Sequence, residues 1–188
     1  YFTNTLGKFN NSFRRSNLLT NVDNVSPAVL SSRAVVRMQQ RFTPTVNVSN
    51  SVVLTFPSNM SLPLFSTSPD QDTFVVRSSN FVIDGVTCRI ANEARVDGLG
   101  QAISSTKLQI VDAGDLSVIV DNIGTYDPNT RVVNIVSFTP TALLGATGEI
   151  KVSVLPANQS AITPILNNIL KYDQDESAIK SVTVDADN

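Results

Sequence analysis

The chain has 188 residues with 14 lysines and arginines, 16 acidic residues, one cysteine, no tryptophan and no histidine. The lack of histidine argues against imidazole-based general-base catalysis, most zinc sites and Ser-His-Asp triads, and one cysteine excludes an internal disulfide. A formal charge of −2 argues against a tight binder of nucleic acid or of an anionic membrane. Asparagine, serine and threonine supply 56 residues, a composition suited to contacts between protein surfaces.

Positive charge is concentrated at the start of the chain. Residues 1–42 hold six basic residues and one acid, a balance of +5, which leaves −7 for residues 43–188. We therefore divide the chain into a basic arm, residues 1–42, and an acidic body, residues 43–188. Opposite charges allow the arm to dock on its own body or on that of a second copy, with scattered solvated charge as the alternative.

The arm carries an apolar stripe at helical spacing, formed by Phe2, Leu6, Phe9 and Phe13. Intervals of four, three and four residues put these side chains on one face of a helix, which predicts a helical N-terminal arm. Such a stripe must be covered, either by the core of the chain itself or by a partner. A short helical turn is predicted after it, at Ser26-Pro27.

Residues 33–42 alternate as in a strand with one wet face. Ala34, Val36 and Met38 lie on one side, and the other side carries three arginines, Arg33, Arg37 and Arg41. An interface or a solvated face explains these arginines better than a nucleic-acid site, because the body beside them is acidic. The candidate interface therefore combines the apolar stripe with the basic residues Arg14, Arg15, Arg33, Arg37 and Arg41.

The body is predicted to be mainly β with a few short helices (α+β), built from antiparallel strands and hairpins. Strands are expected at residues 45–56, 73–77, 81–90, 116–123, 131–138 and 149–155. Asp84-Gly85 predicts a turn or bulge, and Asp127-Pro128-Asn129 predicts a hairpin turn.

The other segments of the body give weaker signals. Residues 56–71 are expected to form a packed loop and residues 92–106 a mobile one. A short helix is expected at 163–171 and a short strand within 179–184.

No candidate for catalysis or for binding a cofactor or metal emerges from the sequence. Cys88 lies in a strand pattern and is expected to be a small buried residue. Acid pairs could offer oxygen ligands to a cation, but solvated loop acids explain them better; the pairs are Asp70/Asp72, Asp112/Asp115, Asp173/Asp175 and Asp185/Asp187. Because carboxylates and hydroxyls would have to act without histidine, an enzyme is the least favoured class.

Neither a membrane span nor a secretory signal is predicted. No apolar run approaches about 18 residues, and the first residues lack a basic stretch followed by an apolar core. The chain starts at Tyr1 and stops at Asn188 without a recognisable closing element, so we expect a fragment of a longer protein.

Three sets of segments carry a likeness to a known family: residues 7–33 leading into VRMQQRFTP at 36–44, IGTYDPNTRVVNIVSF at 123–138, and IKVSVLP at 150–156 followed by NNIL at 167–170. These segments resemble the baseplate wedge proteins of T4-like contractile-tailed phages. Together they cover about half of the chain and look like the C-terminal region of the large wedge subunit, a relative of the baseplate J-type proteins. The middle of the chain, from about Val46 to Leu116, carries no such likeness.

The resemblance implies a structural virion protein of the tail baseplate, assembled in the host cytoplasm. It implies a homodimer that contacts other wedge proteins and links neighbouring wedges into a ring, with no small-molecule substrate. The alternative is a receptor- or glycan-binding β-module. Such modules usually present an aromatic platform, and this chain has only three tyrosines, Tyr1, Tyr126 and Tyr172.

Overall fold

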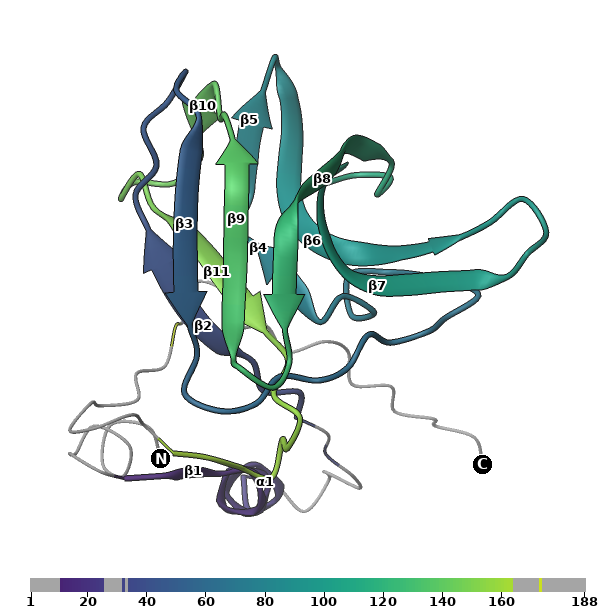
Figure 1. Cartoon of the computed structure of the whole chain (residues 1–188). Coiled ribbons are helices and arrows are strands. Elements are labelled where there is room, and N and C mark those ends of the chain that lie inside the picture. The colour runs from purple at the N-terminus through teal and green to yellow at the C-terminus, as the bar shows by residue number, and fades with distance from the viewer. Residues whose placement is uncertain (1–10, 26–31, 33, 164–172, 174–188) are drawn as a thin grey trace, which may run out of the picture.

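The computed structural model describes residues 11–25, 32, 34–163 and 173, and this part of the chain is mainly antiparallel β (Figure 1). That confirms the mainly β expectation. The elements are β1 (Phe13–Arg14), α1 (Arg15–Asp23), β2 (Met38–Phe42), β3 (Asn50–Thr55), β4 (Val76–Ser78), β5 (Phe81–Ile83), β6 (Val86–Val96), β7 (Ala102–Asp112), β8 (Val118–Asp127), β9 (Val132–Phe138), β10 (Ala142–Leu143), β11 (Ile150–Val154) and β12 (Ala161–Ile162).

Ten of the strands form one curled sheet. Eight of them follow the order β2-β11-β4-β6-β7-β8-β9-β3, with β5 on β6 and β10 on β5. Figure 1 shows the sheet curling so that β3, β9 and β8 lie in front of β2, β11 and β4. The edge strands β2 and β3 meet where Gln40 Nε2 donates to Thr55 O at 3.4 Å. The sheet is thus a nearly closed barrel, which hides one face from water.

The core fills the interior of this curl. In β11, Ile150, Val152 and Val154 are buried while the residues between them face outward. Phe138 of β9 joins the two sides, because its ring lies edge-on at 4.8 Å from Phe81 and 6.2 Å from Phe42. Strand alternation therefore places one continuous apolar cluster between the front and back of the barrel.

Two hairpin turns confirm the sequence reading. Asp84 and Gly85 have φ of 48° and 85°, the paired left-handed conformation that reverses the chain between β5 and β6. Between β8 and β9, Asp127 Oδ1 accepts hydrogen bonds from the N–H groups of Asn129 at 2.8 Å and Thr130 at 3.1 Å. Short-range side-chain chemistry is sufficient to specify both turns.

The predicted strand at residues 45–56 is wrong in its first half, which is a turn. Val46 and Val48 are exposed, and Asn47 has a φ of 59°. The Asn50 side chain holds this turn, since its Nδ2 donates to Thr45 O at 2.8 Å and to Val48 O at 2.7 Å. The valine alternation here faces solvent, and the strand begins only at Asn50.

Residues 92–106 were expected to form a loop with mobility, and the loop prediction is wrong outside the tip at 97–101. β6 runs to Val96 and β7 begins at Ala102, leaving a tight tip at 97–101. Asp97 Oδ1 holds the tip by accepting from Leu99 N at 2.9 Å and Gln101 N at 2.8 Å. Small polar side chains suggested a loop, but the main-chain pairing that makes a strand does not depend on them.

The structure does not show the predicted helical N-terminal arm. The prediction that Phe13 lies on the apolar face of a helix is wrong, because Phe13 lies in β1. β1 pairs with β12, so the backbone at Phe13 is extended; α1 begins only at Arg15. Several expectations lie outside the described residues: the positions of Phe2, Leu6, Phe9 and Arg33, the turn at Ser26-Pro27, the helix through residue 171 and the strand within 179–184.

Candidate interface

Phe13 joins the N-terminal part of the described chain to strand β12 near the end of residues 34–163. It is 4% exposed, pairs with Ile162 of β12 and belongs to the core cluster. Beside it, Arg15 N donates to Ser160 O at 2.9 Å, and the hydroxyls of Ser12 and Thr163 lie 3.0 Å apart. The described start of the basic arm is therefore docked on its own body.

Helix α1 is an outlying element with little internal support. None of its residues is buried, and its N-cap, Arg14, makes no capping hydrogen bond through its side chain. Arg15 lies in the first turn and Asp23 in the last, the reverse of what the helix dipole favours. With Arg14 exposed and Arg15 partly exposed, this end of the molecule presents positive charge to solvent.

Arg37 acts as an internal clamp. Its Nη2 donates to the carbonyl oxygens of Phe74 at 2.8 Å and Val75 at 2.7 Å, and its Nε donates to Ser153 Oγ at 3.3 Å. Burial and the nearby charge of Arg77 lower the pKa of Arg37 to about 9, against an opposing effect of Asp72. The guanidinium thus stays charged at neutral pH and ties the segment before β2 to β11 and to the chain entering β4.

Arg41 belongs to a network of ion pairs on the outer face of β2 and β11. Its Nη2 lies 2.6 Å from Asp173 Oδ2, and its Nη1 lies 3.5 Å from Glu149 Oε2. Lys151 Nζ contacts the same Asp173 carboxylate at 3.2 Å. Since the Arg41 side chain is 46% exposed, it can meet a partner while holding these acids.

A second charged network spans β6, β7 and β8, and no sequence pattern indicates it. Glu93 Oε1 lies 3.2 Å from Lys107 Nζ and 3.3 Å from Arg95 Nε, while Ser105 Oγ donates to Glu93 Oε2 at 2.7 Å. Lys107 also contacts Asp121 at 3.0 Å. Burial opposes ionisation of Glu93, but the hydrogen bonds from Ser105, Lys107 and Arg95 outweigh it and hold its pKa below the ordinary value.

This network predicts a specific pH dependence. The folded pKa of Glu93 is depressed, so its stabilisation is present above the unfolded pKa near 4.5 and is lost as pH falls through the folded pKa. We expect Glu93→Gln to lower the free energy of unfolding by about 2 kcal/mol at pH 7, with the deficit shrinking in acid. Urea unfolding of the wild type and the variant at neutral and acidic pH measures the deficit at pH 7 and its decrease in acid.

The matched control is Glu149→Gln, which removes one 3.5 Å ion pair at a partly exposed carboxylate. Its expected cost is below about 0.5 kcal/mol. If the free energies of unfolding of the wild type and Glu93→Gln change with pH in parallel, the pKa of Glu93 is not depressed in the folded protein.

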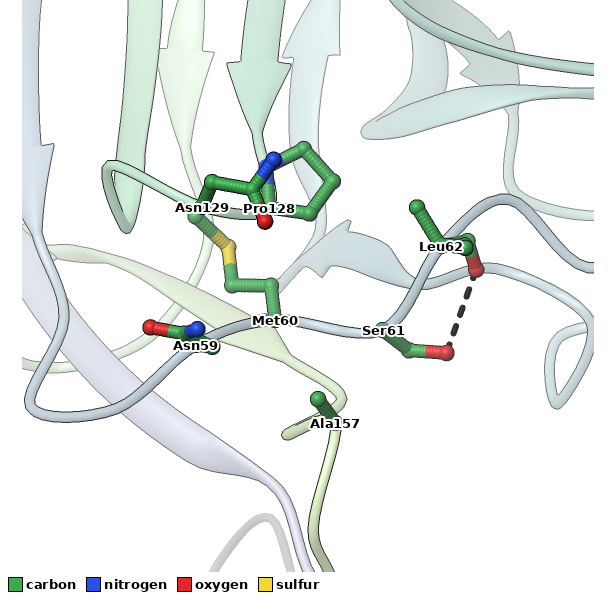
Figure 2. Close-up of a pocket in the computed structure, with 7 residues that line it drawn as sticks. All are labelled: Asn59, Met60, Ser61, Leu62, Pro128, Asn129 and Ala157. Atoms are coloured by element: carbon green, nitrogen blue, oxygen red, sulfur yellow. Dashed lines mark hydrogen bonds between the residues drawn. The ribbon is translucent and has the colours of Figure 1, made fainter.

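An open pocket of about 370 Å³ lies at the end of the barrel where β8 turns into β9. Figure 2 shows the Met60 side chain pointing toward Pro128 and Asn129, with Leu62 to one side and Ala157 below. Backbone hydrogen bonds fix its wall, from Met60 N to Pro128 O at 3.0 Å and from Ala157 N to Asn59 O at 2.9 Å. The lining side chains are all uncharged.

The sequence predicts only part of this pocket. The apolar residues of loop 56–71 indicate that the loop packs, and Met60 within it is 2% exposed. Leu62 and Phe65 instead face solvent, at 69% and 70% exposure. The pocket joins three segments far apart in sequence, a juxtaposition that no local pattern signals.

Chemistry-bearing groups are sparse in the part of the chain that the structure covers. No three His, Cys, Asp or Glu side chains gather there in a way that could hold a metal ion. Cys88 is buried, and burial raises the pKa of its thiol. Tyr126 is 2% exposed, so it offers no aromatic platform to a glycan. Within the described residues, no helix has the length and apolar character to cross a membrane.

Residues 1–41 match a family model, the baseplate structural protein gp6, C-terminal domain III. The described part of this match holds Phe13, Arg37 and Arg41, so it includes β1, α1 and most of β2. The similarity supports a structural protein of the bacteriophage baseplate, and hence a place in the virion tail. No curated protein matches the chain.

Proposed function

We propose that the chain is a wedge component of a contractile phage tail that links neighbouring wedges into the baseplate ring. The match of residues 1–41 to the C-terminal domain III of a baseplate structural protein carries this proposal. In the structure that segment is part of the fold, since Phe13 lies in the core and β2 is an edge strand of the sheet. The described part of the matched segment therefore includes an edge strand, and an edge position supports a role in contacts with a neighbouring subunit.

The surface suits contacts of this kind. Arg41 stands partly exposed beside Glu149 and Asp173, and Arg14 is exposed before α1. Such charges at the rim of an interface set register and steer association. We propose self-association into at least a homodimer, together with contacts to other wedge proteins, and we assign the chain no enzymatic activity, cofactor, nucleic acid, membrane or small-molecule substrate. Assembly in the host cytoplasm belongs to the same proposal.

The baseplate assignment is tested on the virion itself. Antibodies raised against the purified chain are expected to label the base of the tail in electron micrographs of the phage that encodes it. Peptides of the chain are also expected in the mass spectrum of purified tails. Tails that lack these peptides would contradict the proposal, and labelling of the capsid alone would move the protein elsewhere in the virion.

Self-association is tested separately by sedimentation velocity over a concentration series into the high micromolar range. A mass that rises with concentration is expected. A strict monomer throughout would remove the self-association part and leave the baseplate location to the virion experiment.

A further inference from the structure

Two cations lie directly opposite each other on the outer face of the edge strand β2 and its neighbour β11. Arg41 of β2 pairs with Lys151 of β11. The backbone of Lys151 is turned away from β2, since Lys151 N donates to Ser79 Oγ at 3.0 Å and Ser79 N donates to Lys151 O at 2.8 Å. At such a position the side chains of opposite residues approach closely. Like charges there repel and destabilise the ladder unless an acid lies between them.

Two carboxylates meet this pair of cations, and one of them comes from far along the chain. Glu149, just before β11, lies 3.5 Å from Arg41. Asp173 bridges both cations, with its Oδ2 2.6 Å from Arg41 Nη2 and 3.2 Å from Lys151 Nζ. The side chains of Lys151 and Asp173 are only 14% and 15% exposed, so the contact is largely shielded from water. The Arg41–Lys151 pair is therefore a carboxylate-binding site.

Asp173 is joined to the rest of the described chain by a long connection. After β11 the chain leaves the ten-stranded sheet for β12, which forms a separate two-stranded sheet with β1 (Figure 1). Nine residues, 164–172, then separate Thr163 from Asp173. Fully extended, a connection of this length spans roughly 30 Å, about the diameter of a small domain. The covalent connection thus allows Asp173 to reach the Arg41–Lys151 pair of its own chain or that of an adjacent copy.

A second copy supplies the same occupant that the structure shows in this site. Every copy carries both Asp173 and the Arg41–Lys151 pair, so a contact made within one chain can be made between two chains by the same groups. Exchange of an identical element between copies is a low-cost route to a dimer, because it needs no new contact. The Arg41 side chain is 46% exposed, which leaves its guanidinium accessible to a carboxylate from another molecule.

From these observations we infer that two copies exchange Asp173, so that the carboxylate of each copy binds the Arg41–Lys151 pair of the other. The exchange is reciprocal, because each copy gives one carboxylate and receives one, and it therefore closes as a two-fold dimer. The inference rests on the self-association in the proposed function and names the residues that make it.

The first test determines whether the contact is made within one chain or between two. Unlabelled protein and protein labelled with nitrogen-15 are mixed in equal amounts, concentrated, and treated with a carbodiimide, which joins a lysine amine to a carboxylate in direct contact. Mass spectrometry then identifies the crosslinked peptides that contain Lys151 and Asp173. About half of them are expected to combine a labelled with an unlabelled peptide, because random pairing of copies in a two-fold dimer mixes the labels.

The second test removes one side of the contact at a time. Asp173→Asn removes the carboxylate, and Lys151→Gln removes one of the two cations. Each variant alone is expected to associate at least about tenfold more weakly than the wild type in sedimentation velocity. An equimolar mixture is expected to associate more strongly than either variant alone, because Asp173 of the Lys151→Gln copy then meets the intact site of the Asp173→Asn copy.

The control is Asp72→Asn, which changes another surface acid, 56% exposed and 3.7 Å from Arg77, and is expected to associate as the wild type does. Circular dichroism checks the fold of each variant. Crosslinks that join only peptides of the same label would overturn this inference while leaving self-association in place. Wild-type association by Asp173→Asn would have the same meaning. A wild type that stays monomeric would overturn both.

Discussion

Replacing Gly124 with alanine is expected to lower the free energy of unfolding by roughly 3 kcal/mol or more. Gly124 has a φ of +141°, a conformation that side chains rarely adopt, and it pairs with Ile135 where β8 meets β9. A Cβ there would collide with the carbonyl oxygen of Asn134, which is backbone and cannot move without opening the ladder. Urea unfolding followed by circular dichroism measures the effect.

Gly98→Ala is the matched control, because a Cβ at Gly98 meets nothing within 4 Å and its φ lies outside the left-handed region. It is expected to change the free energy of unfolding by less than about 0.5 kcal/mol. Equal effects of the two substitutions would show that the β8–β9 approach at Gly124 is looser than the structure places it.

Replacing Arg37 with methionine is expected to lower the free energy of unfolding by about 3 kcal/mol. Methionine keeps much of the apolar length of the side chain but removes the donors that reach Phe74 O, Val75 O and Ser153 Oγ. The Val75 carbonyl keeps the N–H of Leu155 at 2.8 Å, so the loss falls mainly on Phe74 O and on the link to β11. Lysine is expected to rescue little, because it lacks the planar fork.

Arg95→Met serves as the comparison, since Arg95 is 50% exposed and its ion pair with Glu93 lies at the surface end of that network. It is expected to cost about 0.5 kcal/mol. Arg37 is also a candidate interface residue. Sedimentation velocity of the same two variants therefore tests whether Arg37 takes part in self-association. If Arg37→Met unfolds no more easily than Arg95→Met, the internal clamp is not a stabilising contact.

The strands with the clearest alternation were predictable, and so were the turns. Residues 149–155 contain β11 because every second side chain is apolar, and Asp84-Gly85 and Asp127-Pro128-Asn129 specify reversals through their own backbone and side-chain chemistry. These signals act over a few residues, so the sequence carries them in full. The same local reasoning failed at Val46 and Val48, whose alternation faces solvent, and at residues 92–106, whose strand character comes from pairing.

The contacts of the candidate interface residues could not be predicted, because their partners lie far away in the sequence. Phe13 was placed on a helical stripe by its spacing, yet it pairs with Ile162 near the other end of the described chain. Arg37 and Arg41 were grouped by alternation, and the structure gives them different roles, one clamped on Phe74 and Val75 and the other beside Asp173. Their roles depend on carbonyls and acids that the curl of the sheet brings near.

The sequence by itself determined the kind of molecule: no histidine, one cysteine, strand alternation with firm turn signals, and a likeness to phage baseplate proteins that the family match over residues 1–41 supports. Only the tertiary structure decided which side chains face one another. The pocket beside Met60 and the Glu93 network join strands and loops that the long antiparallel sheet brings together. Local patterns specify which residues are apolar and where the chain turns, whereas register and curvature set the long-range neighbours.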